Sequence, residues 1–331
     1  MPKKLIEKLK NVSIPDDLLS NRFSQDLQKE IPARAKDRRT ILETEDVLKR
    51  WPTSHKLILG DSRKLLEYVN EQVHLIVTSP PYWILKPYKP IEGQLGVIED
   101  YDKFLSELNK VWRGCFKLLV PGGRMCVVVG DVCIPRRRKG RHEIIPLHAD
   151  IQINCRKIGF ENLAPIIWYK ITNISLEVNR GRFLGKPYEP NAIIKNDIEY
   201  ILFFRKPGYR KPTELERKLS VIPEEEYKKW FQQIWRLPGE STKHHPAPYP
   251  LELAERLIRM FSFVDDVVLD PFMGRGTTNI AAMKWGRNSI GIEIDPDFFN
   301  YAVEWMKRES SSLLRNVKIE VLKTSFALKE T

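Results

Sequence analysis

The chain has 331 residues and a formal net charge of +12, from 55 Lys and Arg against 43 Asp and Glu. This length allows a substantial core in one large domain or two modest ones. The charge favours a polyanionic partner such as nucleic acid, although a solvated basic surface gives the same balance. The four cysteines form no CxxC pair and the first ten residues hold no signal-peptide core, so we expect a reducing cytoplasm. No apolar run approaches the roughly 18 residues that span a bilayer, so we expect no membrane association.

The amino-terminal part mixes charged and apolar residues with scattered prolines. Residues 1–54 are therefore predicted to form short helices packed against a larger body. Residues 55–61 read as a strand, followed by a helix over 62–70 and a strand over 73–77, which indicates a parallel sheet. Asp61 at the first strand end could hydrogen-bond a ligand or cap the following helix, and the residues leave both open.

A hydroxyl, a rigid turn and two aromatic rings follow that second strand, in Thr78-Ser79-Pro80-Pro81-Tyr82-Trp83. Ligands of open α/β sheets bind outside the carboxyl ends of the strands, so this stretch is well placed for chemistry. The prolines stiffen the turn and leave its carbonyls free to accept hydrogen bonds. Tyr82 and Trp83 could stack on a nucleobase or pack in the core.

Helices and strands continue to alternate after this turn. Residues 84–96 form a loop long enough to be a mobile cover over a site. Apolar spacing predicts a helix over 100–119, a buried strand over 124–130 and a helix over 144–158. A loop between the last two carries the densest basic run of the chain, which suits phosphates or is solvated surface. Its residues are Arg136, Arg137, Arg138, Lys139 and Arg141.

Two stretches are candidates for reading DNA bases. Strands are predicted over 164–170 and 198–205, and residues 171–196 between them carry amides and arginines. Asn reads adenine and Arg reads guanine in a groove, but these residue types equally suit an irregular loop. The candidate DNA-contacting residues here include Arg180 and Arg182, together with Asn173, Asn179, Lys186, Tyr188 and Asn191. Residues 206–236 are also basic and aromatic, so base reading is not assigned to one stretch alone.

The carboxyl-terminal third contains a second constellation. Residues 245–250 (HPAPYP) lead into a helix over 251–263, and the paired histidines lack a Cys or carboxylate to complete a metal site. We therefore expect no metal. A strand over 267–270 ends in Asp270, and a glycine-containing turn and a helix follow. This is neither a GxGxxG fingerprint nor a P-loop.

An acidic residue, Glu293, ends the next strand, over 289–294. It lies roughly 20 residues past the glycines, the spacing at which a carboxylate binds ribose hydroxyls. This spacing predicts an adenosine-bearing ligand with no required pyrophosphate, and S-adenosylmethionine fits; turn glycines with exposed acids are the alternative. The remaining predicted elements are a helix over 296–308 and an edge strand over 317–322.

Four motifs together resemble the amino-methyltransferases of DNA: TSPPYW at 78–83, HPAPYP at 245–250, DPFMGRGTT at 270–278 and GIEID at 291–295. The resemblance covers about residues 55–305, and the catalytic motif precedes the cofactor motif, as in the permuted beta class. It implies a Rossmann-like S-adenosylmethionine-dependent fold, with a mostly parallel doubly wound sheet and an antiparallel strand pair. Residues 55–331 would form the catalytic domain, with 171–196 and 206–236 as target-recognition insertions.

Ser rather than Asp before Pro-Pro-Tyr, with Trp after it, resembles the cytosine-N4 group. The implied function is direct, site-specific methyl transfer to the N4 amine of a flipped-out cytosine in double-stranded DNA. An adenine-N6 enzyme, an RNA substrate and an inactive DNA-binding module remain alternatives, and a cognate restriction endonuclease remains open as a partner. Carbon-5 chemistry needs a cysteine next to proline, which none of the four cysteines is.

The resemblance also assigns site residues. The catalytic loop would consist of Ser79, Pro80, Pro81 and Tyr82, with Tyr82 and Trp83 stacking on the base. The implied cofactor-binding residues are Asp61, Thr78, His245, Pro246, Asp270, Phe272, Gly274, Gly276, Thr277, Thr278 and Glu293. In this assignment Asp61 lies near the adenine and residues 245–250 lie beside the methionine end.

Overall fold

The computed structural model describes residues 12–85, 88–134, 140–170, 190, 194, 196–239, 249–312 and 316–324. Within them, one sheet contains β1 (Thr53–Leu59), β2 (Val73–Thr78), β3 (Leu119–Val129), β6 (Glu161–Tyr169), β7 (Ile198–Arg205), β8 (Ile234–Arg236), β9 (Val267–Asp270), β10 (Asn288–Glu293) and β11 (Val317–Lys323). Its order is β11-β1-β10-β9-β2-β3-β7-β6-β8. Neighbouring strands are parallel except for β7, which runs antiparallel to β3 and β6. The predicted α/β class with a mostly parallel sheet is confirmed.

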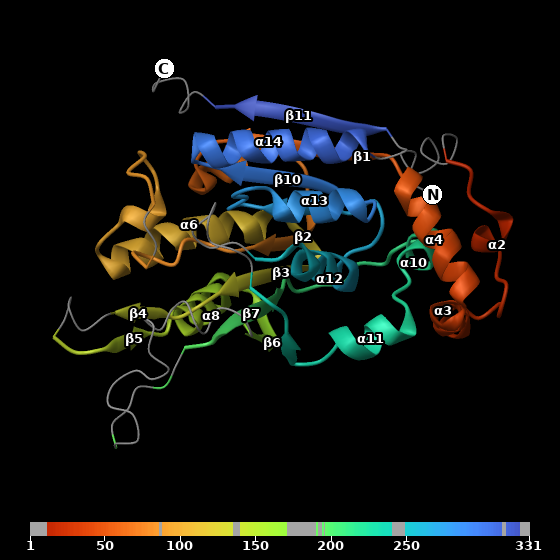
Figure 1. The fold of residues 1–331 in the computed structure, drawn as a ribbon, viewed down its shortest axis with the longest axis horizontal. Coiled ribbons are helices and arrows are strands. Elements are labelled where there is room, and N and C mark those ends of the chain that lie inside the picture. Colours follow the sequence, from red (N-terminus) through yellow and green to blue (C-terminus); the bar gives the residue numbers. More distant parts are fainter. Residues whose placement is uncertain are drawn as a thin grey trace.

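Helices cover both faces of this sheet (Figure 1). They are α5 (Leu65–Tyr68), α6 (Tyr101–Leu118), α8 (Leu147–Ile158), α12 (Leu251–Phe261), α13 (Thr277–Lys284) and α14 (Pro296–Ser311). The side chains of α6 and α8 share one buried cluster with β2 and β3, whereas α12, α13 and α14 pack on the other face. No helix among the described residues is both long and apolar enough to cross a membrane.

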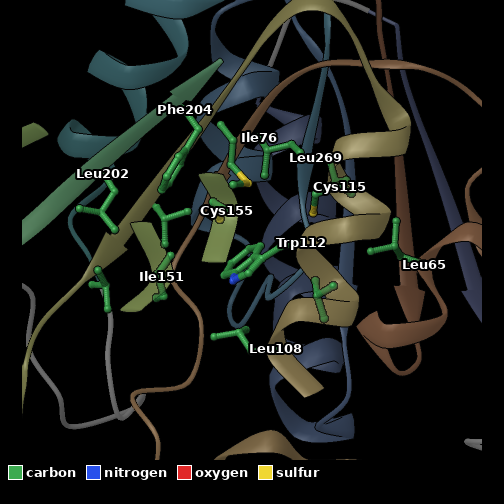
Figure 2. Packing of buried hydrophobic residues seen from close by; sticks show 14 of the residues in the cluster. Leu65, Ile76, Leu108, Trp112, Cys115, Ile151, Cys155, Leu202, Phe204 and Leu269 are labelled. Atoms are coloured by element: carbon green, nitrogen blue, oxygen red, sulfur yellow. The ribbon is translucent and has the colours of Figure 1, made fainter. Parts of the chain in front are cut away.

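The packing of α6 shows how the sequence pattern builds the core. Leu108, Trp112 and Cys115 are fully buried, at the spacing of one helix face. Figure 2 shows these side chains in the cluster that also holds Ile76 and Leu269 of the central strands. Complete burial of a large apolar side chain contributes about 1.5–3 kcal/mol. The predicted helix over 100–119 is therefore confirmed and fixed against the middle of the sheet.

A group of helices among the described residues gathers at the opposite end of the sheet from the carboxyl ends of β10 and β11 (Figure 1). They are α2 (Asp16–Leu19), α3 (Leu27–Lys36), α4 (Arg38–Arg50), α10 (Glu214–Leu219) and α11 (Glu224–Trp230). A buried cluster joins Leu18 and Trp51 to Leu215. The fully buried Arg34 donates to Glu30 at 2.6 Å. The amino-terminal helices thus pack on the body of the protein at the end remote from those strand ends.

Several predicted boundaries are wrong. The helix expected over 62–70 is a short turn, η1 (Ser62–Lys64), followed by α5. The helix expected over 144–158 starts only at Leu147, because β5 (Glu143–Ile145) pairs with β4 (Val132–Ile134). β3 starts at Leu119, before the Pro-Gly-Gly sequence, where a register shift against β2 accommodates the turn. β8 was not predicted, since three residues give no periodicity.

Candidate active site

A cleft opens at the carboxyl ends of β1, β2, β9 and β10. This is the edge at which open α/β sheets bind their ligands. The predicted site residues that line the cleft are Asp61, Ser79, Pro80, Pro81, Phe272, Gly274 and Glu293. The structure therefore brings together two motifs that are almost 200 residues apart in the chain. Ser79 of the first motif and Glu293, from the GIEID motif that follows the second, line the same space.

The loop after the Pro-Pro turn contributes Tyr88 to the cleft, a residue that sequence reasoning missed. A Cβ on Gly96 would lie 2.1 Å from the Tyr88 ring, so glycine is needed there for this ring to pack. Lys89 pairs with Asp295, at 3.4 Å, and with Asp297 at the start of α14. The predicted cover loop is thus attached to the far side of the cleft. The only sequence signal for Tyr88 was its place in that loop.

Helix α14 contributes Phe298 to the cleft. Sequence reasoning missed this residue as well, because an apolar side chain in the first turn of a helix looks the same whether it meets a ligand or the core. Burial of the neighbouring Phe299 in the core illustrates the ambiguity. No sequence signal available for a single chain separates the two.

Glu293 is buried at the carboxyl end of β10 and holds the glycine turn. Its carboxylate accepts hydrogen bonds from the backbone N–H groups of Gly274 at 2.7 Å, Asp295 at 2.8 Å and Ile294 at 2.9 Å. Burial outweighs these bonds and raises the pKa of Glu293 to about 7. Glu293 therefore lines the cleft as a carboxylate that changes charge near neutral pH.

Asp270 ends β9 but does not line the cleft. It is 1% exposed, and its carboxylate accepts from Thr78 Oγ1 at 2.7 Å and Thr278 Oγ1 at 2.8 Å. Tyr249 OH at 3.2 Å and the backbone N–H of Phe272 at 3.0 Å complete the set of donors. Burial raises the pKa of Asp270. Three predicted cofactor-binding residues thus form a buried cluster that shapes the turn instead of facing the cavity.

Tyr249 was not singled out in the sequence, although it belongs to the HPAPYP motif. Its hydroxyl also contacts Thr278, so it connects the approach to α12 with the start of α13. Of the predicted residues in that motif, His245 and Pro246 lie outside the described residues. The signal that could have found Tyr249 was a hydroxyl-bearing ring between two prolines, beside a strand end that carries a carboxylate.

Gly276 caps α13 with a backbone φ of +89°, a conformation that glycine adopts without strain. A Cβ there would lie 3.1 Å from Ala302, so the turn also packs closely on α14. The adjoining Thr277 is the first residue of α13 and does not line the cleft. Both residues therefore set the path of the turn that carries Phe272 and Gly274.

Asp61 both lines the cleft and caps the turn after β1. Its role as a cap therefore does not exclude the ligand-binding role that was also predicted for it. It is 5% exposed and accepts from the backbone N–H of Arg63 at 2.9 Å. The Arg63 guanidinium donates to Asp61 at 2.6 Å and to Glu107 of α6 at 2.6 Å. These hydrogen bonds raise the pKa of Arg63. The adenine-proximal position assigned to Asp61 is therefore held by an arginine that bridges two carboxylates.

The two predicted stacking rings are buried in the largest core cluster. Tyr82 is 4% exposed and Trp83 is 8% exposed. Trp83 has a positive φ of 47°, donates from Nε1 to the Ile98 carbonyl at 2.8 Å and meets the Tyr101 ring edge-on at 5.1 Å. Ser79 Oγ donates to Tyr82 OH at 3.2 Å. The predicted catalytic loop is thus held in place by the packing and hydrogen bonds of its own two aromatic residues.

Few of the predicted DNA-binding residues can be placed. Arg141 is exposed and lies in the connection between β4 and β5, beyond the carboxyl end of β3. The other predicted DNA-contacting residues, Arg136, Arg137, Arg138, Lys139, Asn173, Asn179, Arg180, Arg182, Lys186, Tyr188 and Asn191, lie outside the described residues. Within the described residues, no group of three His, Cys, Asp or Glu side chains could hold a metal ion.

Comparisons with known proteins place the chain in a family. Residues 73–304 match the family model described as "DNA methylase", which covers the N6 and N4 enzymes. The Type II methyltransferase M.MjaI of Methanocaldococcus jannaschii is 38% identical over 273 residues, which is 73% of this chain and 88% of the relative. M.MthZI of Methanothermobacter thermautotrophicus, also named a Type II methyltransferase, is 35% identical over 74% of each chain.

Solved structures give the same result. TTHA0409 of Thermus thermophilus, solved in complex with S-adenosyl-L-methionine, is 52% identical, with a TM-score of 0.68 and coverage of 82% of this chain and 99% of that one. The cytosine-N4-specific PvuII DNA methyltransferase is 20% identical, with a TM-score of 0.56 over 81% of this chain and 98% of that one, and shares the fold. The fold is therefore that of the S-adenosylmethionine-dependent methyltransferases, and the chain belongs to the N6/N4 DNA methylase family.

Proposed function

We propose that this protein is a site-specific DNA methyltransferase that transfers a methyl group from S-adenosylmethionine directly to the N4 amine of a flipped-out cytosine. The observation that carries this proposal is the shared cleft lined by both Ser79-Pro80-Pro81 and Glu293 with Gly274. One side offers acceptors for an amine, and the other offers a carboxylate for ribose hydroxyls. The two substrates of an amine methylation would therefore meet in one space.

The cofactor assignment rests on the chemistry of the cleft and on a relative. Glu293 would accept the ribose hydroxyls, and Asp61 would lie near the adenine. The glycine turn is held by Glu293 and by the Asp270 cluster, and it would lie beside the methionine part. TTHA0409, 52% identical to this chain, is solved with S-adenosyl-L-methionine. When bound, S-adenosylmethionine supplies an electrophilic methyl group; the residues of the chain bind it and exclude water.

The amine would be held by Ser79 Oγ and the Pro80 carbonyl, which accept its two hydrogens. Cytosine delocalises the amine lone pair into its ring, and two in-plane acceptors favour a pyramidal nitrogen that can attack. Positioning of this kind lowers the barrier by several kcal/mol. Covalent catalysis by cysteine has no support. Cys115, Cys126 and Cys155 are buried, and burial raises the pKa of each thiol. The partly exposed Cys133 lies in β4 and does not line the cleft. Direct transfer is therefore the step that these residues serve.

Double-stranded DNA is the proposed partner, and residues 171–196 are the proposed base reader. The flanks of this stretch, at the ends of β6 and β7, adjoin the catalytic loop, since Glu199 contacts Tyr82. The other candidate, 206–236, contains α10 and α11, which pack with the amino-terminal helices. Arg210 binds Asp266 at the amino end of β9. Residues 206–230 of that stretch thus lie at the end of the sheet remote from the cleft, whereas its last residues, in β8, pair with Ile167–Tyr169 of β6 at the end where the cleft opens. A base reader must lie near the cleft, which favours residues 171–196.

Binding of S-adenosylmethionine is expected to strengthen as the pH rises through 7. Ribose hydroxyls donate to the ionised form of Glu293, whose pKa of about 7 is raised by burial above its ordinary value of 4.5. Below pH 7 the ligand must therefore displace a proton, and the dissociation constant should be about tenfold larger at pH 6 than at pH 8. Calorimetry across this range measures the change directly.

Two variants sharpen this measurement. Glu293→Gln should bind more weakly at every pH and lose the pH dependence, because the amide does not titrate. Glu320→Gln, on exposed β11, should keep both the affinity and the pH dependence of the unaltered chain. If the affinity of Glu293→Gln kept the pH dependence of the unaltered chain, Glu293 would not be the group that binds the ribose hydroxyls. The stability of the free protein should change in the opposite direction to its affinity for the ligand. Because the pKa of Glu293 is raised from 4.5 to about 7 by folding, its contribution to the free energy of unfolding should fall as the pH rises from 4.5 to 7.

Methyl transfer itself can be tested with labelled cofactor. We expect label from methyl-labelled S-adenosylmethionine to enter enzymatically amplified duplex DNA, which carries no prior methylation and offers many sequences. Heat-denatured DNA and duplex RNA of the same sequence are the controls for the proposed substrate. Labelling of the RNA with no labelling of the DNA would contradict the proposal.

A further inference from the structure

A chain of hydrogen bonds runs from the catalytic serine to a carboxylate on another strand. Ser79 Oγ donates to Tyr82 OH at 3.2 Å, and Tyr82 OH donates to Glu199 Oε2 at 3.1 Å. Lys170 Nζ pairs with the other oxygen of Glu199. Both hydroxyls therefore donate in the same direction, away from the cleft and toward Glu199. This polarity is the one needed to pass a proton out of the cleft.

The fold explains why these groups meet. β7 is the antiparallel strand, so its first residues lie at the sheet edge where β2 ends in the catalytic loop. Glu199 is its second residue, and Lys170 directly follows β6 beside it. A Cβ on Gly130 would lie 3.2 Å from Glu199 Cγ, so glycine at the end of β3 leaves space for this side chain.

The surroundings of the two side chains suit Tyr82 to pass a proton on and Glu199 to accept it. Tyr82 is 4% exposed, and burial, followed by the charge of Glu199, raises the pKa of its hydroxyl well above the ordinary value. The phenol therefore stays neutral and can pass a proton on without storing a charge. The Glu199 side chain is 14% exposed and Lys170 is 18% exposed, so the carboxylate end of the chain reaches solvent.

We propose that Glu199 is the final acceptor of the proton lost in methyl transfer, acting through Tyr82 and Ser79. This inference rests on the proposed amine methylation. The nitrogen lone pair forms the N–C bond, the C–S bond breaks and its electron pair goes to sulfur. The nitrogen, now cationic, gives a proton to Ser79 Oγ as the Ser79 proton moves to Tyr82 and the Tyr82 proton moves to Glu199. The methylated amine ends neutral, and Glu199 ends as a carboxylic acid that releases its proton to water.

The same chain acts before the methyl group moves. A hydroxyl that donates its own hydrogen becomes a stronger hydrogen-bond acceptor. This strengthening accumulates along a series of hydrogen bonds and is larger when the last acceptor is charged. Ser79 would therefore draw the amine hydrogen more strongly because Glu199 is ionised. Glu199 is in this sense a positioning residue for Ser79, and its removal should slow the transfer step itself.

Glu199→Gln tests the acceptor with little change of shape, since Gln can still accept from Tyr82 but cannot take its proton. We expect the single-turnover rate at saturating DNA and S-adenosylmethionine to fall about 100-fold. The dissociation constants of both ligands should stay within twofold. Glu161→Gln is the matched control, because Glu161 pairs with Arg205 at the other end of the same two strands. Its rate should not change.

A double-mutant cycle tests whether the groups act in series. Tyr82→Phe keeps the ring and removes the hydroxyl, so it should lower the rate by a similar factor. The double variant Tyr82→Phe with Glu199→Gln should be no slower than the slower single variant, because either change breaks the chain. In Glu199→Ala, added formate should restore part of the rate by supplying a carboxylate, whereas Glu199→Gln should not respond.

Three results would overturn the inference: a Glu199→Gln rate within twofold of the unaltered chain, multiplicative losses in the double variant, or loss of ligand binding and thermal stability with a normal rate per folded molecule. The last would show that Glu199 only secures the loop. Failure of the proposed function would be seen separately, as absence of methyl transfer to DNA by the unaltered chain, and would remove this inference with it.

Discussion

Ser79→Ala is expected to lower the rate of methyl transfer by about 10²–10³ while S-adenosylmethionine still binds normally. Ser79 lines the cleft beside Pro80 and is the one hydroxyl of the proposed pair of amine acceptors. Loss of a preorganised hydrogen-bonding group that acts on the reacting atom costs a factor of this size. The carbonyl of Pro80 remains, so some activity should survive.

The measurement is single-turnover transfer to duplex DNA, with calorimetry of S-adenosylmethionine on the same preparations. Ser79 is half-buried, and among the described residues its hydroxyl hydrogen-bonds to Tyr82 alone, so the thermal midpoint should change little. Near-normal turnover of Ser79→Ala would show that the Ser79 hydroxyl is not needed to accept the amine hydrogen. A loss of cofactor affinity equal to the loss of rate would instead place it in the cofactor site.

Asp270→Ala is expected to destabilise the protein by about 2–4 kcal/mol and to weaken S-adenosylmethionine binding at least tenfold. The carboxylate accepts from Thr78, Thr278, Tyr249 and the Phe272 N–H, and its removal leaves buried donors without a partner. Binding should weaken because the Phe272–Gly274 turn loses its support, since Asp270 itself does not line the cleft.

Asp266→Ala is the matched control for this effect. Asp266 is 2% exposed at the amino end of β9, where it accepts from Arg210 and from the Phe263 N–H. The four-residue strand separates it from the cleft by about 13 Å. We expect a comparable loss of stability with unchanged cofactor affinity. Equal affinity in Asp270→Ala and Asp266→Ala, measured on folded protein, would show that Asp270 has no influence on the site.

The sequence predicted the elements whose pattern is set by burial. The run from Val73 to Val77 and the helical spacing around Trp112 follow from strands and helices that face the core, so their existence and order were predicted correctly. The two site motifs were found because parallel strands end at one edge. That rule alone places Ser79 near Glu293, although it gives no distance.

What could not be predicted depends on contacts between distant residues. The cofactor assignment treated Asp270 as facing the ligand, because a strand-end carboxylate reads the same whether it faces a cavity or three buried hydroxyls. Glu199 was not predicted as a site residue. It reaches Tyr82 only because β7 runs antiparallel to β3, and no local sequence pattern indicates the direction of that strand. Tyr88 and Phe298 reach the cleft only through the path of a loop and the tilt of a helix.

The identity of the methylated base tests the central proposal most directly. Amplified duplex DNA would be treated with the protein and methyl-labelled S-adenosylmethionine, digested to nucleosides and analysed by mass spectrometry. Direct transfer to the cytosine amine predicts labelled N4-methyldeoxycytidine in the treated DNA and about 10²–10³ times less of it with Ser79→Ala in the same time. Labelled N6-methyldeoxyadenosine in its place would contradict the assignment of the target, and labelled 5-methyldeoxycytidine would contradict direct amine transfer altogether.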